Sequence, residues 1–231
     1  MNDKNFDNIL ALDTSSLDLK LALSFGGDRL VKSRETMDKT HGRVIIKKIN
    51  ELFSSAGLRP DALEALVVSV GPGSFTGLRI SLAVAKGMAV ALDIPVVAVS
   101  MFELAAFKIR QEKTPVKVLV PFKKNEFFLV SVTGGEFDSA TIMTVSLADF
   151  HEKVGDSPVV GVNVDIAAIF PDARLLPGRG KIEYDAADLI FLGQEKLAKG
   201  AITDLAALEP LYLQKSQAEI RFEKLRKDQK A

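Results

Sequence analysis

The sequence predicts an α/β protein made of two related subdomains, each containing a mixed sheet. Strand patterns followed by helix patterns occur in both halves of the 231-residue chain, and this order is typical of α/β architecture. The strand pattern restarts around Thr114 and Pro115. We therefore expect an N-terminal subdomain over residues 1–105 and a C-terminal subdomain over residues 106–231.

The composition disfavours several classes of protein. The chain has 30 basic and 30 acidic residues, so no overall charge attracts it to nucleic acid or to an anionic membrane. It contains no cysteine, which excludes disulfides, thiolate metal sites and cysteine nucleophiles. No apolar window reaches the roughly 20 residues that span a bilayer. We expect a cytoplasmic protein that does not contact a membrane.

The chain opens with a predicted antiparallel meander of three strands. Residues 9–12 are apolar and typical of a buried strand, and the turn-forming residues 13–16 follow. Apolar and polar residues then alternate over 19–25, as in a strand with two different faces. The Gly-Gly-Asp sequence at 26–28 predicts a second hairpin turn, which leads to a third strand over 29–34.

Two predicted helices follow, separated by a buried strand. The first, over 40–56, is amphipathic and ends at Gly57, a residue that favours the left-handed conformation of a C-terminal cap. The apolar strand 65–70 leads through a glycine-rich turn to the second helix, 75–92, whose first turn Ser74 can cap.

The helix 75–92 is apolar over most of its circumference. Its two charged side chains, Arg79 and Lys86, are seven residues apart and so share one stripe. A helix of this kind must be covered on more than one side. Its own sheet covers one side, and we expect something else to cover the other.

The remaining elements repeat the strand and helix pattern. Residues 96–99 predict a strand, and Ser100 with Glu103 forms a capping box for a helix that ends near Arg110. The rest of the chain predicts strands over 116–122, 127–132 and 159–162, helices over 147–153 and 186–199, and a charged tail from Ser216 that we expect to be frayed or weakly docked.

Two turns contain residues that could bind a phosphate. Asp13, Thr14 and Ser15 offer amides, hydroxyls and a carboxylate for magnesium. Gly71 and Gly73 precede a helix N-terminus, where amides and the helix dipole attract anions. Each turn also has a purely structural explanation: residues 13–15 can be an ordinary hairpin turn, and residues 71–73 a tight connection between a strand and a helix. The second turn matches neither the P-loop nor the dinucleotide-binding motif. Both interpretations stay open.

Other catalytic motifs are scarce. His41 and His151 are far apart, and neither has a second histidine at metal-ligand spacing. The sequence contains no nucleophile elbow of the GxSxG type. A peptidase is therefore disfavoured, and we expect no catalytic residue, metal or cofactor.

Several segments resemble a known family. ILALDTSS at 9–16, a helix opening with His41, and GPGSFTGLRISLAVAKGMAVALDIPVVAVS at 71–100 resemble, in order and spacing, the TsaB (YeaZ) family of bacterial tRNA threonylcarbamoyladenosine biosynthesis proteins. PLYLQ at 210–214 is similar to the family's late proline and tyrosine motif. The second half departs from the family pattern: where many relatives carry a run like DARRGEVY, this chain has PFKKNEFF at 121–128.

The resemblance implies an actin-like ATPase fold, the fold of Hsp70, sugar kinases and actin, with a reduced second subdomain. It implies a non-catalytic paralogue of the enzyme TsaD, which transfers a threonylcarbamoyl group to the adenosine beside the anticodon of tRNAs reading codons that begin with A. The family heterodimerises with TsaD and supports that step. The ATPase TsaE joins the complex, TsaC makes the threonylcarbamoyl adenylate, and tRNA is reached only through the complex.

In the family the contact with TsaD is a helix bundle, which corresponds here to the helices 40–56 and 75–92 of the N-terminal subdomain. When the partner is absent, we expect the same helices to pair two copies of the chain in a homodimer. The residues expected to bind the partner are apolar or small: Ile45, Ile49, Phe53, Leu78, Ala83, Gly87 and Met88.

An ATP-dependent phosphotransferase of the sugar kinase type is the second hypothesis. It is motivated by the Asp13 turn and the actin-like plan, and it predicts binding of ATP with magnesium that Asp13→Ala abolishes. If the scaffold hypothesis holds instead, the phosphate site is vestigial and consists of Asp13, Thr14, Ser15, Gly71 and Gly73.

Overall fold

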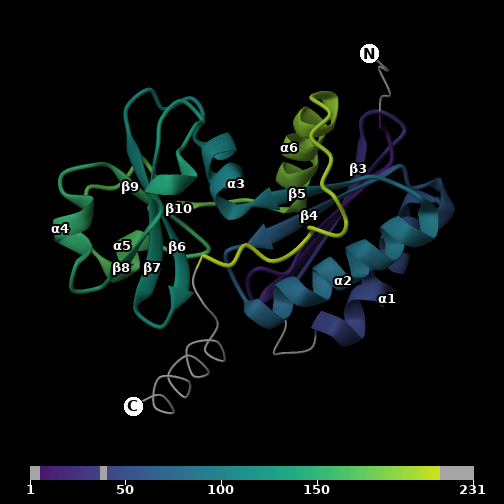
Figure 1. Ribbon diagram of the computed structural model, residues 1–231, viewed down its shortest axis with the longest axis horizontal. Helices are drawn as coiled ribbons and strands as arrows, with labels where there is room; N and C mark the ends of the chain where they lie inside the picture. The colour runs from purple at the N-terminus through teal and green to yellow at the C-terminus, as the bar shows by residue number, and fades with distance from the viewer. Residues whose placement is uncertain (1–5, 37–40, 214–231) are drawn as a thin grey trace, which may run out of the picture.

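The computed structural model describes residues 6–36 and 41–213. Two mixed sheets of five strands each lie toward opposite ends of the molecule (Figure 1). The first sheet has the order β3-β2-β1-β4-β5, and its strands are β1 (Ile9–Asp13), β2 (Asp18–Phe25), β3 (Arg29–Thr36), β4 (Ala65–Gly71) and β5 (Val96–Ser100).

The second sheet repeats the plan of the first. In the first sheet β1, β2 and β3 are antiparallel neighbours, which confirms the predicted meander, whereas β4 and β5 run parallel to β1. The second sheet has the corresponding order β8-β7-β6-β9-β10 and the same pattern of directions. Its strands are β6 (Val116–Lys123), β7 (Glu126–Val132), β8 (Met143–Ser146), β9 (Val159–Val162) and β10 (Lys181–Ile182).

Helices cover both faces of the first sheet. α1 (His41–Ala56) and α2 (Phe75–Leu92) lie on one face, where Leu10 and Leu12 of β1 point into the core. α6 (Ala186–Ala198) lies on the other face (Figure 1), where Ile9 and Ala11 are buried. Because successive side chains of a strand point to opposite faces, β1 contributes to two separate cores.

A central core joins the two halves of the chain. It contains residues of the first sheet, of α3 (Met101–Lys108) and α6, and of the facing side of the second sheet. The outer face of the second sheet packs against α4 (Phe150–Val154) and α5 (Ile166–Ile169). Two short 3-10 helices, Pro60–Ala62 and Ser139–Thr141, complete the regular structure of the described residues.

The capping residues predicted from the sequence lie at the ends of the observed helices. Ser74 accepts a hydrogen bond from the Gly77 N–H, the capping box of Ser100 and Glu103 is present, and Gly57 has a φ of 67°. The helix predicted over 147–153 is shorter and later, because α4 begins only at Phe150. Residue 40, the predicted start of α1, and the tail from residue 214 lie outside the described residues.

The division between residues 105 and 106 stays a prediction. The position of α6 does not follow it. This helix belongs to the second half of the sequence, yet it packs on β1, β2 and β5 of the first sheet. By length and composition α2 could cross a membrane, but in this fold Leu78, Leu82, Ala85 and Ala89 pack it against its own sheet.

Candidate functional site

The turn after β1 does not form an open phosphate site. Asp13 and Thr14 have no exposed surface, and Ser15 is 4% exposed. The Ser15 N–H donates to Asp13 Oδ1 at 2.9 Å, so the carboxylate caps its own turn. Asp13 is therefore enclosed by protein, although the sequence suggested a carboxylate free to hold magnesium.

The other oxygen of the Asp13 carboxylate is paired inside the fold. Lys20 on β2 places its ammonium 3.3 Å from Asp13 Oδ2, and the Tyr184 hydroxyl lies 2.8 Å from the same oxygen. Lys20 Nζ also donates to the Tyr184 hydroxyl at 2.9 Å. The charge of Asp13 is thus balanced by a cation of this chain.

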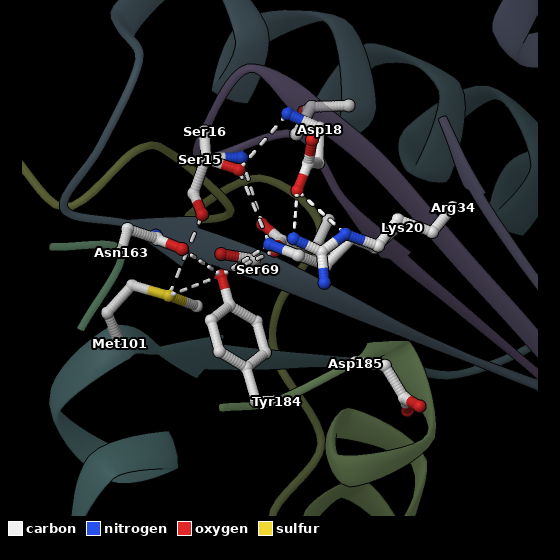
Figure 2. Close-up of polar contacts among 12 residues, drawn as sticks. Ser15, Ser16, Asp18, Lys20, Arg34, Ser69, Met101, Asn163, Tyr184 and Asp185 are labelled. Carbon is white, nitrogen blue, oxygen red and sulfur yellow. Dashed lines mark hydrogen bonds and ion pairs between the residues drawn. The ribbon is translucent and has the colours of Figure 1, made fainter. Parts of the chain in front are cut away.

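Residues distant in sequence complete this buried cluster. Figure 2 shows Lys20, Tyr184, Asn163 and Met101 converging below the turn that carries Ser15. The Tyr184 hydroxyl lies 3.0 Å from Asn163 Oδ1 and 3.6 Å from the sulfur of Met101. Side chains from both halves of the chain therefore meet beneath the turn that the sequence offered as a phosphate site.

Tyr184 keeps its proton in this environment. Burial raises the pKa of its hydroxyl well above the ordinary value, and the negative charge of Asp13 raises it further. The neutral hydroxyl can then donate to one acceptor while it accepts from Lys20. The sequence did not predict this role, because the alternation over 19–25 places Lys20 on the polar face of the strand and indicates no partner for it. The small size of Ala22 and Ser24 on that face was the available signal that the face is buried.

The glycine-rich turn packs directly on the first turn. The Ser74 N–H donates to the Ser15 carbonyl at 2.7 Å, and a Cβ at Gly73 would overlap that same carbonyl. Gly71 has a φ of 89° and requires glycine for that reason. The structure thus brings the predicted phosphate residues together: they contact one another, and Ser15 and Gly73 also line a cleft between the two halves of the chain.

Thr14 fixes the start of α2. Its hydroxyl lies 2.7 Å from the Gly77 carbonyl oxygen and 2.8 Å from Ser81 Oγ, and a Cβ at Gly77 would overlap the Thr14 carbonyl oxygen. The two turns therefore set the position of α2 on the sheet.

Four of the residues predicted to bind the partner are buried in this fold. Ile45, Ile49, Phe53 and Leu78 are at most 3% exposed, because they point from α1 and α2 into the first sheet. Ile45, Ile49 and Phe53 form the core and offer no surface to a partner in this fold, whereas Leu78 lines a cleft at the start of α2.

The outer side of α2 contains the remaining predicted contacts. Ala83 and Gly87 are exposed, and Met88 is half-buried. Val90, on the same side, is 73% exposed, and Ile46 on the neighbouring α1 is 52% exposed. Small and apolar residues therefore lie on the outer surface of the helix pair.

Two sheets with one repeated plan, joined through a central core, define an actin-like α/β protein. A family model described as "TsaD: tRNA N6-adenosine threonylcarbamoyltransferase" matches residues 34–207. The chain is 30% identical to the tRNA threonylcarbamoyladenosine biosynthesis protein TsaB of Bacillus subtilis (strain 168), over 93% of this chain and 97% of that protein. This chain belongs to the TsaB (YeaZ) family.

A second relative agrees with this assignment, and a solved structure shares the fold. The TsaB protein of Haemophilus influenzae is 33% identical over 54% of this chain and 53% of its own length. The solved structure of YeaZ from Pseudomonas aeruginosa shares the fold, with a TM-score of 0.70 and 24% identity over 90% of this chain and all of that one.

Proposed function

We propose that this chain is a non-catalytic subunit in tRNA threonylcarbamoyladenosine biosynthesis that binds TsaD through the outer side of α2 and α1. The single observation that carries the proposal is the exposed stripe of small and apolar residues on α2, which consists of Ala83, Gly87 and Val90. The family names its members for this pathway, and TsaD is a homologous protein, since its family model matches this chain.

Gly87 supports close approach of a partner. A glycine inside a helix costs roughly 1 kcal/mol relative to alanine. Nothing in this chain lies within 4 Å of the position where a Cβ would stand at Gly87, so the fold itself does not require a glycine there. A helix backbone packed on the outer side of α2 would explain the missing side chain.

The neighbouring side chains provide the apolar area for a complex. Val90 and Ile46 are exposed, and Ile80, Val84 and Met88 are half-buried. Full burial of an exposed side chain of this kind contributes about 1.5–3 kcal/mol, and because these five are already partly buried, together they give a gross gain on the order of 5 kcal/mol before the costs of association.

The phosphotransferase hypothesis is less well supported. It needs Asp13 to reach a magnesium ion, whereas Asp13 is fully buried and paired with Lys20 at 3.3 Å. A buried carboxylate that is already neutralised has little to gain from a further cation.

The remaining partners follow from the proposed pathway. TsaE and TsaC would act with the TsaD complex, and when TsaD is absent the outer side of α2 would pair with a second copy of the chain. Such a pathway places the protein in the cytoplasm.

Capture by tagged TsaD tests the proposal, with Ala83→Glu as the variant and Ala198→Glu as its control. Both alanines are exposed on helices, but only Ala83 lies on the proposed surface. Ala83→Glu should lose capture while its unfolding curve stays unchanged, and Ala198→Glu should bind normally. Normal capture of Ala83→Glu would contradict the proposed surface. Light scattering should show a homodimer that TsaD converts into a heterodimer.

A further inference from the structure

A cleft between the two halves of the chain is separate from the outer side of α2. Its volume is about 1160 Å³. One wall is formed by Ser15 and by Phe75 and Arg79 at the start of α2, and the other by the turn between β6 and β7. The segment before residue 214 closes one side, and its Tyr212 lines the cleft.

The charge of this cleft has one sign. Arg79, Lys123 and Lys124 line it, and none of its described lining residues is acidic. Glu126, just outside the lining, forms an ion pair with Lys123 at 3.9 Å, which balances part of one of these charges and leaves Arg79 and Lys124 without an acidic residue in the lining. In a chain with no net charge, this is a local concentration of positive charge that suits an anion.

Aromatic rings accompany these cations. Phe75 and Tyr212 are 44% and 48% exposed, and their ring centroids are 5.7 Å apart. The Arg79 guanidinium lies 3.9 Å from the Phe75 ring centroid and donates to the Tyr212 hydroxyl at 3.3 Å. On the opposite wall, Lys123 Nζ is 4.3 Å from the ring centroid of Phe122.

A basic groove with accessible aromatic rings is the arrangement that binds single-stranded nucleic acid, because phosphates contact the cations and bases stack on the rings. A cleft of about 1160 Å³ is larger than most small-molecule sites, which occupy roughly 300–1,000 Å³. Much of the remaining lining is apolar, but the two lysines disfavour a protein partner, since lysine is depleted in protein interfaces.

The sequence after the cleft has the same sign of charge. The 18 residues that follow Leu213, one of the lining residues, contain six basic and three acidic residues, a net charge of +3. The basic residues are Lys215, Arg221, Lys224, Arg226, Lys227 and Lys230, and the acidic ones are Glu219, Glu223 and Asp228.

We propose that this cleft binds an unpaired segment of tRNA directly, with phosphates at Arg79, Lys123 and Lys124 and bases against Phe75 and Tyr212. The choice of tRNA rests on the proposed function. The proposal departs from the expectation that tRNA is reached only through the complex, because it assigns an RNA contact to this chain itself.

Fluorescence anisotropy of an end-labelled, unmodified tRNA transcript with the full chain, without TsaD, tests this inference. Charge reversal by Lys123→Glu with Lys124→Glu should weaken binding at least roughly tenfold. The matched control, Arg59→Glu with Lys199→Glu, reverses two exposed charges away from the cleft and should leave binding unchanged. Equal weakening by both pairs would overturn the cleft as the site.

Two further variants separate phosphate contacts from stacking. Lys123→Ala with Lys124→Ala should reduce the slope of log affinity against log salt by about 1.4. Tyr212→Leu should weaken binding roughly tenfold and leave that slope unchanged, because stacking is not electrostatic. An unchanged affinity for Tyr212→Leu together with an unchanged salt slope for the lysine pair would contradict the proposal.

Competition distinguishes the other ligands. Displacement of tRNA by ATP with magnesium at similar concentrations would identify a mononucleotide site and overturn the assignment to an RNA strand.

If wild type binds TsaD but no tRNA, this inference fails and the proposed function stands. If it binds tRNA but not TsaD, the proposed function fails. Loss of TsaD capture by the lysine variants, with tRNA binding intact, would make the cleft a protein-docking site.

Discussion

The hydroxyl of Tyr184 lies 2.8 Å from Asp13 Oδ2, although 171 residues separate the two in sequence. Asp13 ends β1 of the first sheet, and Tyr184 follows β10 of the second. This contact therefore joins the two halves of the molecule at the turn that follows β1.

Tyr184→Phe should lower the free energy of unfolding by about 1.5–3 kcal/mol, the usual contribution of a buried hydrogen bond to a charged group. Urea unfolding measures the change. Tyr212→Phe is the control, since that ring is half exposed and the change should have little effect. Equal stability of wild type and Tyr184→Phe would show that the contact between the two halves adds nothing.

Removing Lys20 should be more damaging than removing Tyr184. Lys20→Met leaves the buried Asp13 carboxylate without its cation, which costs roughly 3–5 kcal/mol. Asp13→Asn in the same chain should recover part of the loss, because the neutral amide needs no cation and can still accept from the Ser15 N–H. Unfolding of the two single variants and the double variant gives the coupling energy, and strictly additive losses would contradict a direct pair.

The raised pKa of Tyr184 should make the free energy of unfolding fall with increasing pH in alkaline solution. Its pKa in the folded state is raised above the ordinary value of 10.0, so above that pH the unfolded state loses this proton first. The contribution is complete below pH 10.0 and declines above it, by about 1.4 kcal/mol per pH unit. Unfolding of wild type between about pH 9 and 11 should be steeper in pH than that of Tyr184→Phe, which retains the same lysines. Parallel curves would contradict the assignment.

Much of the fold follows from local sequence signals, whereas the buried cluster does not. The meander, the Ser74 cap and the capping box at Ser100 were predictable because turn and cap residues act within a few positions of themselves. The pairing of Lys20 with Asp13 and Tyr184 was not, because no periodic pattern in one segment specifies a partner from the other half of the chain.

The same limit applies to the residues predicted to bind a partner, some of which are buried and some exposed. Apolar periodicity identified α1 and α2, but α2 is apolar on most sides, so the pattern could not separate the side facing the sheet from the outer side. Packing makes that distinction: Leu78 lies in the core, whereas Ala83 is exposed.

Two glycines of α2 should respond to alanine in opposite ways. At Gly77 a Cβ would overlap the Thr14 carbonyl oxygen, so Gly77→Ala forces the two turns apart and should cost about 1–3 kcal/mol or more. At Gly87 a Cβ meets open space, so Gly87→Ala removes a flexible backbone position and should stabilise the chain by up to roughly 1 kcal/mol. Urea unfolding of both variants compares the same chemical change on the same helix. Loss of stability at Gly87, or none at Gly77, would contradict the division of α2 into a side held by the two turns and a side left for a partner.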